Sequence, residues 1–98
     1  MKDSLRQQFE RLALRLNELD ATLADPGVAG NMKRYRELSS ERAEVSGLVE
    51  RFRRFEQRER DLADAQAMLS DSDMAEMAQQ EIIEARAATR AAGKRLLL

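Results

Sequence analysis

Two stretches of this 98-residue sequence carry side chains whose types and spacing could do chemistry. The first is acidic: MLSDSDMAEMAQQEIIE, residues 68–84, has five acids, three methionines and no positive charge. Closely spaced carboxylates are ligands for calcium, and paired ones can act as acid and base. The second is basic: RFRRFEQRER, residues 51–60, has five arginines and two interleaved phenylalanines. Arginines alternating with aromatic residues are typical of surfaces that bind phosphate or single-stranded nucleic acid.

The acidic stretch does not fit a calcium-binding loop. Asp71 and Asp73 match the first two ligand places, but Ala75 stands at the fifth, Glu76 replaces the required glycine, and Ile82 occupies the twelfth. The chain has no His and no Cys, which removes the usual zinc ligands, disulfides and the commonest general base. We therefore expect no metal, no cofactor and no catalytic residue.

A helix start explains the same acids, because carboxylates near a helix N-terminus favour the positive end of its dipole. Two cap registers compete. With Ser70 as the cap, Leu69 and Met74 form a hydrophobic staple; with Asp73 as the cap, Glu76 completes a capping box. The residues alone do not choose between them.

The arginine stretch has a structural interpretation and a functional one. Phe52 and Phe55 fall on one helix face and predict core positions flanked by solvated arginines, which pair with acids at helical spacings. The alternative is a contact surface for phosphate or an acidic partner protein, made by Arg51, Arg53, Arg54, Arg58 and Arg60. A second basic group, residues 86–95, is explained by the helix dipole, which favours positive charge in closing turns.

The elements that must position these residues are helices. Charged residues make up 36% of the chain and aromatic residues only 4%, with one Pro and four Gly, a mixture rich in helix formers and poor in strand formers. The net charge of −1 does not attract nucleic acid to the chain as a whole. No apolar run approaches the ~18 residues that span a bilayer.

Apolar residues recur every three or four positions and predict helices over residues 4–24, 32–69 and 72–96. Ser4 and Gln7 predict a capping box for the first helix, and Asn31 a cap for the second. The expected apolar faces are Leu5, Phe9, Leu12, Leu16, Leu19 and Leu23 in the first helix; Met32, Tyr35, Leu38, Val45, Leu48, Val49, Phe52, Phe55, Leu62 and Leu69 in the second; and Met74, Met77, Ala78, Ile82, Ala85, Ala88, Ala92 and Leu96 in the third.

The helix lengths and short connections predict the architecture. Short connections make neighbouring helices antiparallel, and the central helix, about 57 Å long, is longer than either partner. We expect an all-α fold of three antiparallel helices, with one helix folded back on each half of a long central helix, as a single coiled-coil-like domain over 1–98. The closing run Leu96-Leu97-Leu98 has no polar tail, which indicates a piece of a longer chain.

The residues that begin the third helix also carry a resemblance. MLSDSDMAEMAQQE is similar to M-L-x-D-P-E-M-x-E-M-A-x-E-E in the amino-terminal domain of the bacterial peptide chain release factor 1 family. LADPGV followed by YRELSSERAEV resembles L-x-D-P-x-V and Y-x-E-L-S-x-E-Y-A-x-L of the same family, and the likeness covers nearly the whole chain. The related release factor 2 family usually carries a Trp-Asn pair, and this chain has no Trp.

The resemblance implies a role in translation termination. Release factors of this class read a stop codon, UAA or UAG in this family, and trigger hydrolysis of peptidyl-tRNA in the cytoplasm. Reading belongs to a Pro-x-Thr motif and hydrolysis to a Gly-Gly-Gln loop, and neither motif occurs in these residues. The resemblance thus implies a non-enzymatic module whose partners are the ribosome, at its stalk-base protein and rRNA, and the class II release factor GTPase, with no membrane or DNA.

Two positions depart from the family pattern. Ser72 stands where Pro is common, which suggests Asp71 as the cap of the third helix, and Gly27 replaces an acid, which weakens any helical turn in residues 25–31. The alternative function is a generic coiled-coil interaction module or a tRNA-binding helical arm. A tRNA arm should show a basic stripe along one face, whereas charges alternate in sign through residues 33–64.

Overall fold

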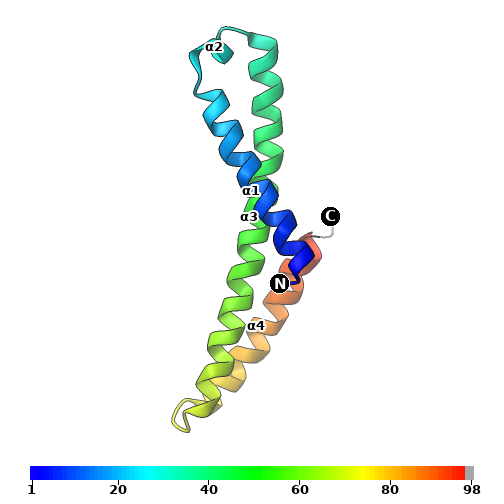
Figure 1. Ribbon diagram of the computed structural model, residues 1–98. Coiled ribbons are helices and arrows are strands. Elements are labelled where there is room, and N and C mark those ends of the chain that lie inside the picture. Colours follow the sequence, from blue (N-terminus) through cyan, green and yellow to red (C-terminus); the bar gives the residue numbers. More distant parts are fainter. Residues whose placement is uncertain (97–98) are drawn as a thin grey trace. The chain divides into compact units, whose positions relative to one another are not determined.

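The computed structural model describes residues 1–96, and nearly all of them are helical (Figure 1). Its elements are α1 (Asp3–Leu23), α2 (Pro26–Ala29), α3 (Met32–Ala67), the short 3-10 helix η1 (Met68–Ser70) and α4 (Ala75–Leu96). The described residues contain no strand, so the all-α prediction is confirmed, as is the long central helix. Two residues of the closing leucine run, 97 and 98, lie outside the described range. No helix within 1–96 is both long and apolar enough to cross a membrane.

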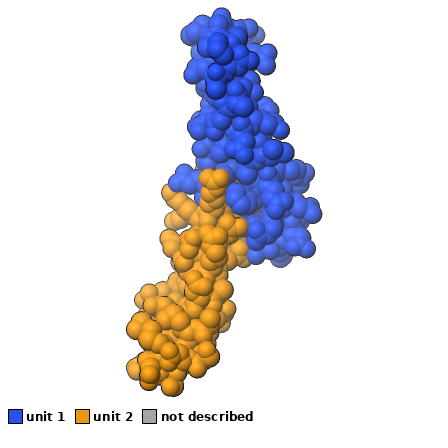
Figure 2. Space-filling model, turned by 60° about the vertical axis from the view of Figure 1, so that its left-hand side comes forward, with its two compact units in different colours: residues 1–50 blue, residues 51–98 orange. Residues whose placement is uncertain are grey.

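The chain divides into two compact units, residues 1–50 and residues 51–98 (Figure 2). Helix α3 contributes its first half to one unit and its second half to the other. Within each unit, one helix runs antiparallel to the α3 segment beside it, as the lengths and short connections predicted (Figure 1).

In the first unit, the apolar face of α1 packs on α3. Leu19 is fully buried and lies in one cluster with Val45 and Val49. Partly buried apolar residues pack around that cluster: Phe9, Leu12, Leu16 and Leu38. The heptad spacing in α1 predicted this face, and burying a Leu or Val side chain is worth about 1.5–3 kcal/mol.

In the second unit, α4 folds back along α3 on an alanine-rich face. The buried residues are Phe52, Ala65, Ala78, Ile82 and Ala92. Gly93 faces the ring of Phe55 so closely that a Cβ at this position would lie 3.3 Å from the ring atom Cε2. Small residues therefore let the two helices approach, as the sequence predicted for this face.

The cap of α3 is the predicted one, and the cap of α1 is not. Asn31 Oδ1 accepts a hydrogen bond from the backbone N–H of Arg34 at 3.2 Å, which satisfies a free N–H of the first turn. The capping box at Ser4 is wrong, because α1 already begins at Asp3 and Lys2 occupies the cap position without a side-chain hydrogen bond. Asp3 still places a negative charge in the first turn.

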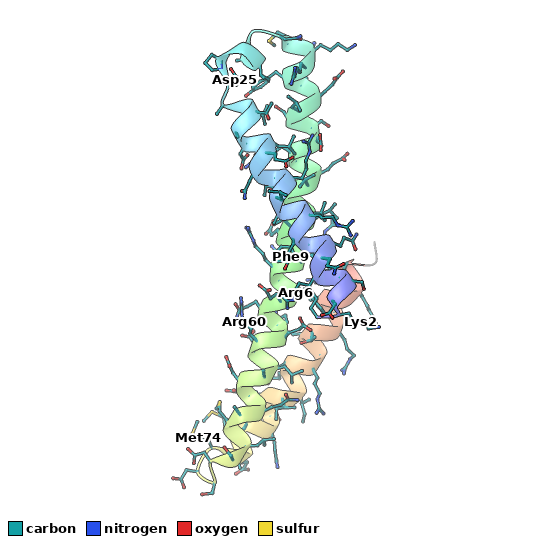
Figure 3. All side chains as sticks on the ribbon, in the orientation of Figure 1. Lys2, Arg6, Phe9, Asp25, Arg60 and Met74 are labelled. Carbon is teal, nitrogen blue, oxygen red and sulfur yellow. The ribbon has the colours of Figure 1, made fainter. Side chains whose placement is uncertain are left out.

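The connection between α3 and α4 holds another difference. Helix α4 begins at Ala75, later than expected, and Asp71 does not cap it. Instead Asp71 Oδ1 accepts from the N–H of Asp73 at 3.0 Å, and the carbonyl of Asp71 accepts from the N–H of Met74 (labelled in Figure 3) at 3.0 Å. Aspartate readily makes such local turns in competition with a helix, so Asp71 closes the turn before α4.

A helical turn also forms in residues 25–31 despite Gly27. Asp25 (Figure 3) caps α2 by accepting from the N–H of Gly27 at 2.9 Å, and Pro26 occupies the first helical position, which suits its fixed φ. Val28 is buried. The cap, the proline and this apolar contact together offset the glycine.

Some residues expected on packed faces are exposed. They are Met32, Tyr35, Leu69 and Met77. Each lies in the first turn of a helix or in the connection after α3, where the packed seam ends. Met77 also points away from α3, because successive helical residues point about 100° apart and Ala78 occupies the buried position.

Candidate functional site

The arginine stretch lies on α3 within the second unit, and all five predicted contact residues are exposed: Arg51, Arg53, Arg54, Arg58 and Arg60. They are exposed because the phenylalanines of the stretch take the inner face. Phe52 is 3% exposed and Phe55 is half-buried against Gly93. Base stacking needs an exposed ring, so the phenylalanines serve the core and only the arginines remain for contact.

Arg58 and Arg60 form pairs with neighbours on their own helix. Arg60 (Figure 3) lies 3.4 Å from Glu56 and donates to Gln57 Oε1 at 2.8 Å. Arg58 lies 3.3 Å from Asp61. The helical spacing predicted pairs of this kind, which are worth only a few tenths of a kcal/mol each in water. They nevertheless reduce the positive field of Arg58 and Arg60.

Three arginines converge at one place in the second unit. Arg51 and Arg54 on α3 line a small cavity of about 10 Å³ with Ala92 and Arg95 on α4. We call Arg51, Arg54 and Arg95 the arginine cluster. Arginines that come from two helices can offer donors in several directions, which suits a tetrahedral phosphate better than a single planar carboxylate.

Sequence reasoning missed Arg95, because the helix dipole already explained its charge. The available signal was the run from 86 to 95, where Arg86, Arg90, Lys94 and Arg95 have no acid among them. In an antiparallel pair of helices this run must lie beside 51–60, and the cavity shared by Arg51 and Arg95 shows that it does.

Charge is strongly segregated along the second unit. Residues 51–60 and 86–95, which lie side by side, hold nine basic and two acidic residues. Residues 61–85, which form the turn and its flanking helix segments, hold seven acidic residues and no basic one. The unit is nearly neutral in total, yet one end attracts anions and the other attracts cations.

The acidic stretch makes hydrogen bonds within its own turn. Within residues 1–96, no group of three or more carboxylates is arranged to hold a metal ion. Asp71 and Ser70 instead bond to the backbone of their own turn, Asp71 to the N–H of Asp73 and Ser70 Oγ to the carbonyl of Ala67 at 2.9 Å. Asp71 therefore acts in the local structure of the turn, and the other acids of the segment contribute to the negative charge of that end.

The charged pairs of the first unit join α1 to α3. Arg15 donates to both carboxylate oxygens of Glu41 at 2.7 Å, and Arg42 pairs with Asp20. The hydrogen bonds from Arg15 lower the pKa of the Glu41 carboxyl, and the same bonds raise the pKa of Arg15. These pairs join α1 to α3 at exposed positions. The arginine cluster is therefore the candidate for contact with a partner.

Comparison with known proteins places the chain in a family. The PCRF domain matches residues 12–98. Peptide chain release factor 1 of Delftia acidovorans is 54% identical over 87 residues, which cover 89% of this chain and 24% of that protein. The factors of Leptothrix cholodnii and Acidovorax sp. are 53% and 52% identical, over 89% and 84% of this chain and 24% and 22% of theirs.

The chain thus spans about a quarter of the length of these relatives, within their amino-terminal part. No solved structure gives a significant match. The family match covers both helical units and includes the arginine stretch, the connection to α4 and the second basic run. On these grounds the chain belongs to the PCRF domain family.

Proposed function

We propose that this chain is the amino-terminal module of a peptide chain release factor and contributes ribosome contacts during translation termination in the cytoplasm. The relatives at 52–54% identity are all named peptide chain release factor 1, and their likeness runs through both units. On this proposal, reading of UAA and UAG and the hydrolysis step belong to other parts of the full protein, and this module is not itself an enzyme. Its partners are the stalk-base protein and rRNA of the ribosome and the class II release factor GTPase.

The observation that carries the contact proposal is the arginine cluster. Arg51, Arg54 and Arg95 are exposed, lie around one cavity and belong to the end of the unit with nine basic residues against two acidic ones. A phosphate backbone binds such a surface by displacing counterions, so the affinity falls steeply as salt rises. We assign the cluster, with Arg53, Arg58 and Arg60 of the same arginine stretch, to contact with rRNA.

Charge reversal tests this assignment. In the variant Arg51→Glu/Arg54→Glu/Arg95→Glu, we expect ribosome binding of the chain to weaken by more than tenfold, and its salt dependence to become shallower. The measurement is the Kd for purified ribosomes at three or more salt concentrations. The matched control is Arg11→Glu/Arg34→Glu/Arg36→Glu, which makes the same charge change at exposed residues of the first unit and should weaken binding far less.

Other outcomes would count against the proposal. Equal losses of ribosome affinity in both variants would show that only the net charge of the chain matters, and not the position of the arginines. An unchanged Kd and an unchanged salt dependence would show that the arginines of the cluster do not contact the ribosome and only face solvent. Tight binding of free tRNA that the cluster variant abolishes would favour a tRNA-binding arm. The release factor assignment itself fails if the full gene product lacks a Gly-Gly-Gln segment.

A further inference from the structure

The outer face of the first turns of α4 carries a second surface, at the acidic end of the second unit. Met77 and Ile83 are 52% and 64% exposed, and both line an open depression of about 710 Å³. They face outward because Ala78 and Ile82 take the buried stripe of the helix. Single exposed apolar residues are normal on any protein, but these two line one depression together with acidic residues.

The polar residues of the same depression define what can dock there. It is lined by Asp73, Glu76, Met77, Gln79, Gln80 and Ile83, which we call the acidic-apolar face. Its two carboxylates belong to the segment 61–85, in which no basic residue balances the seven acids. A polyanion such as RNA is repelled by that field, whereas Lys and Arg side chains can cover Met77 and Ile83 with their apolar stems and bring their charges to the carboxylates.

We propose that the acidic-apolar face docks a cationic amphipathic helix of a partner protein. An amphipathic helix recognises a helical surface through apolar residues at every third or fourth position, and its flanking cations complement the acids. The two glutamines supply amide donors and acceptors between the apolar residues. This surface and the arginine cluster use opposite charges, so the proposal does not depend on the rRNA contact.

Peptide titration tests the proposal directly. The probes are a synthetic 14-residue Leu/Lys helix with Leu at amphipathic spacing, a peptide of the same composition in scrambled order, and a Leu/Glu helix. Added to the isotope-labelled 98-residue chain, the Leu/Lys helix should shift NMR signals within about residues 73–84. Its Kd should be at least about fivefold lower than that of the scrambled peptide, and should rise with salt because charge pairs contribute. The Leu/Glu helix should not bind.

Variants separate the apolar contribution from charge alone. Met77→Ser/Ile83→Ser should raise the Kd about tenfold, which corresponds to roughly 1.4 kcal/mol. The matched control is Leu14→Ser/Met32→Ser, which changes side chains of similar exposure, 60% and 64%, in the first unit and should change the Kd less than twofold. Because all four side chains are exposed, both variants should keep the melting temperature within a few degrees, which circular dichroism checks.

Several results would overturn the proposal. Equal binding of the scrambled peptide would show that charge alone causes the binding. Equal losses of affinity in both double variants would show that the peptide does not bind at the acidic-apolar face. A concentration-dependent dimer that Met77→Ser/Ile83→Ser dissociates would assign the face to a second copy of the chain. Binding of an RNA oligonucleotide at residues 73–84 would assign it to nucleic acid. Protection of Met77 from peroxide in the isolated full-length gene product would assign it to another segment of that polypeptide.

Discussion

At the scale of single residues, the arginines of this chain fall into two groups, those with partners on their own helix and those gathered by two helices. The spacing of Arg58 and Arg60 predicted partners on their own helix, and the structure places Asp61 and Glu56 beside them. The antiparallel arrangement brings the run 86–95 beside 51–60, but which of its residues meets Arg51 and Arg54 depends on the register of α4 along α3, and the structure gives Arg95. Pairs within one helix follow from spacing, whereas a cluster built by two helices follows from packing.

The Arg15–Glu41 pair predicts a pH effect at the residue scale. The hydrogen bonds from Arg15 lower the pKa of Glu41 below its ordinary value of 4.5. A carboxyl with a lowered folded-state pKa stabilises the fold above its unfolded-state pKa, and this contribution is lost as the pH falls through the folded-state value. The gap in melting temperature between the native chain and Glu41→Gln should therefore be largest near pH 7 and should close below about pH 4.

Carbon NMR titration of the Glu41 carboxyl measures the same effect directly. In Arg15→Gln the pKa of Glu41 should return toward 4.5, because the guanidinium that lowers it is gone. The control variant Arg11→Gln, an exposed arginine on the same helix, should leave it in place. A pKa of Glu41 that is the same in all three proteins would show that the pair is not formed in solution.

Helix lengths and faces were predicted well, and helix ends less well. The apolar period identified Leu19, Val45 and Phe52 as core, because one buried stripe of a helix leaves a clear pattern in the sequence. The start of α4 was missed, because Ser70, Asp71 and Asp73 can all cap, and the choice among them depends on backbone hydrogen bonds in the turn. The position of a helix end depends on a few weak hydrogen bonds, and alternative sets of these bonds compete within a few residues of each other.

Two glycines give a matched test of helix packing. Gly47 lies in the middle of α3, and an added Cβ would meet nothing within 4 Å beyond the adjacent backbone of its own helix. Gly47→Ala should therefore stabilise the chain by roughly 0.5–1 kcal/mol through helix propensity alone. At Gly93 the same methyl group would lie 3.3 Å from the Phe55 ring, which must move slightly. Gly93→Ala should therefore gain less than Gly47→Ala, or lose stability.

Urea unfolding followed by circular dichroism measures both variants. The double variant Gly93→Ala/Phe55→Leu is the control, because the smaller side chain makes room for the methyl group and should recover part of the difference. An equal gain from both alanines would mean that α4 does not approach Phe55 as closely as the structure shows.

Across the whole chain, composition predicted the fold class, but it could not show how charge is distributed in the folded chain. A net charge of −1 suggested a chain with little electrostatic preference, yet the second unit separates nine basic residues from seven acidic ones along its length. A sum over the sequence cannot show this, because the pattern arises when 86–95 folds back beside 51–60. The all-helical class can be predicted without knowing how the helices pack, since it depends on the local spacing of apolar residues and on the scarcity of strand formers.

The two units also differ in the residues that fill their cores, which predicts a difference in local stability. The first unit buries Leu19, Val45 and Val49, whereas three of the five buried residues in the second are alanines. Each missing methylene lowers the hydrophobic contribution to the free energy of unfolding by about 0.8 kcal/mol. The better helix propensity of alanine offsets only a few tenths of a kcal/mol of this. We therefore expect α4 to open at a lower free energy than α1.

Native-state hydrogen exchange measures these two opening free energies separately. Amides near Leu19 in α1 should exchange more slowly than amides near Ala85 in α4, after correction for intrinsic rates. Leu19→Ala removes the fully buried leucine of the first unit and should lower protection in α1 by about 2–5 kcal/mol, the usual range for a buried leucine. In the native chain, α4 amides that exchange more slowly than those of α1 would show that close helix packing through small residues outweighs the buried apolar area.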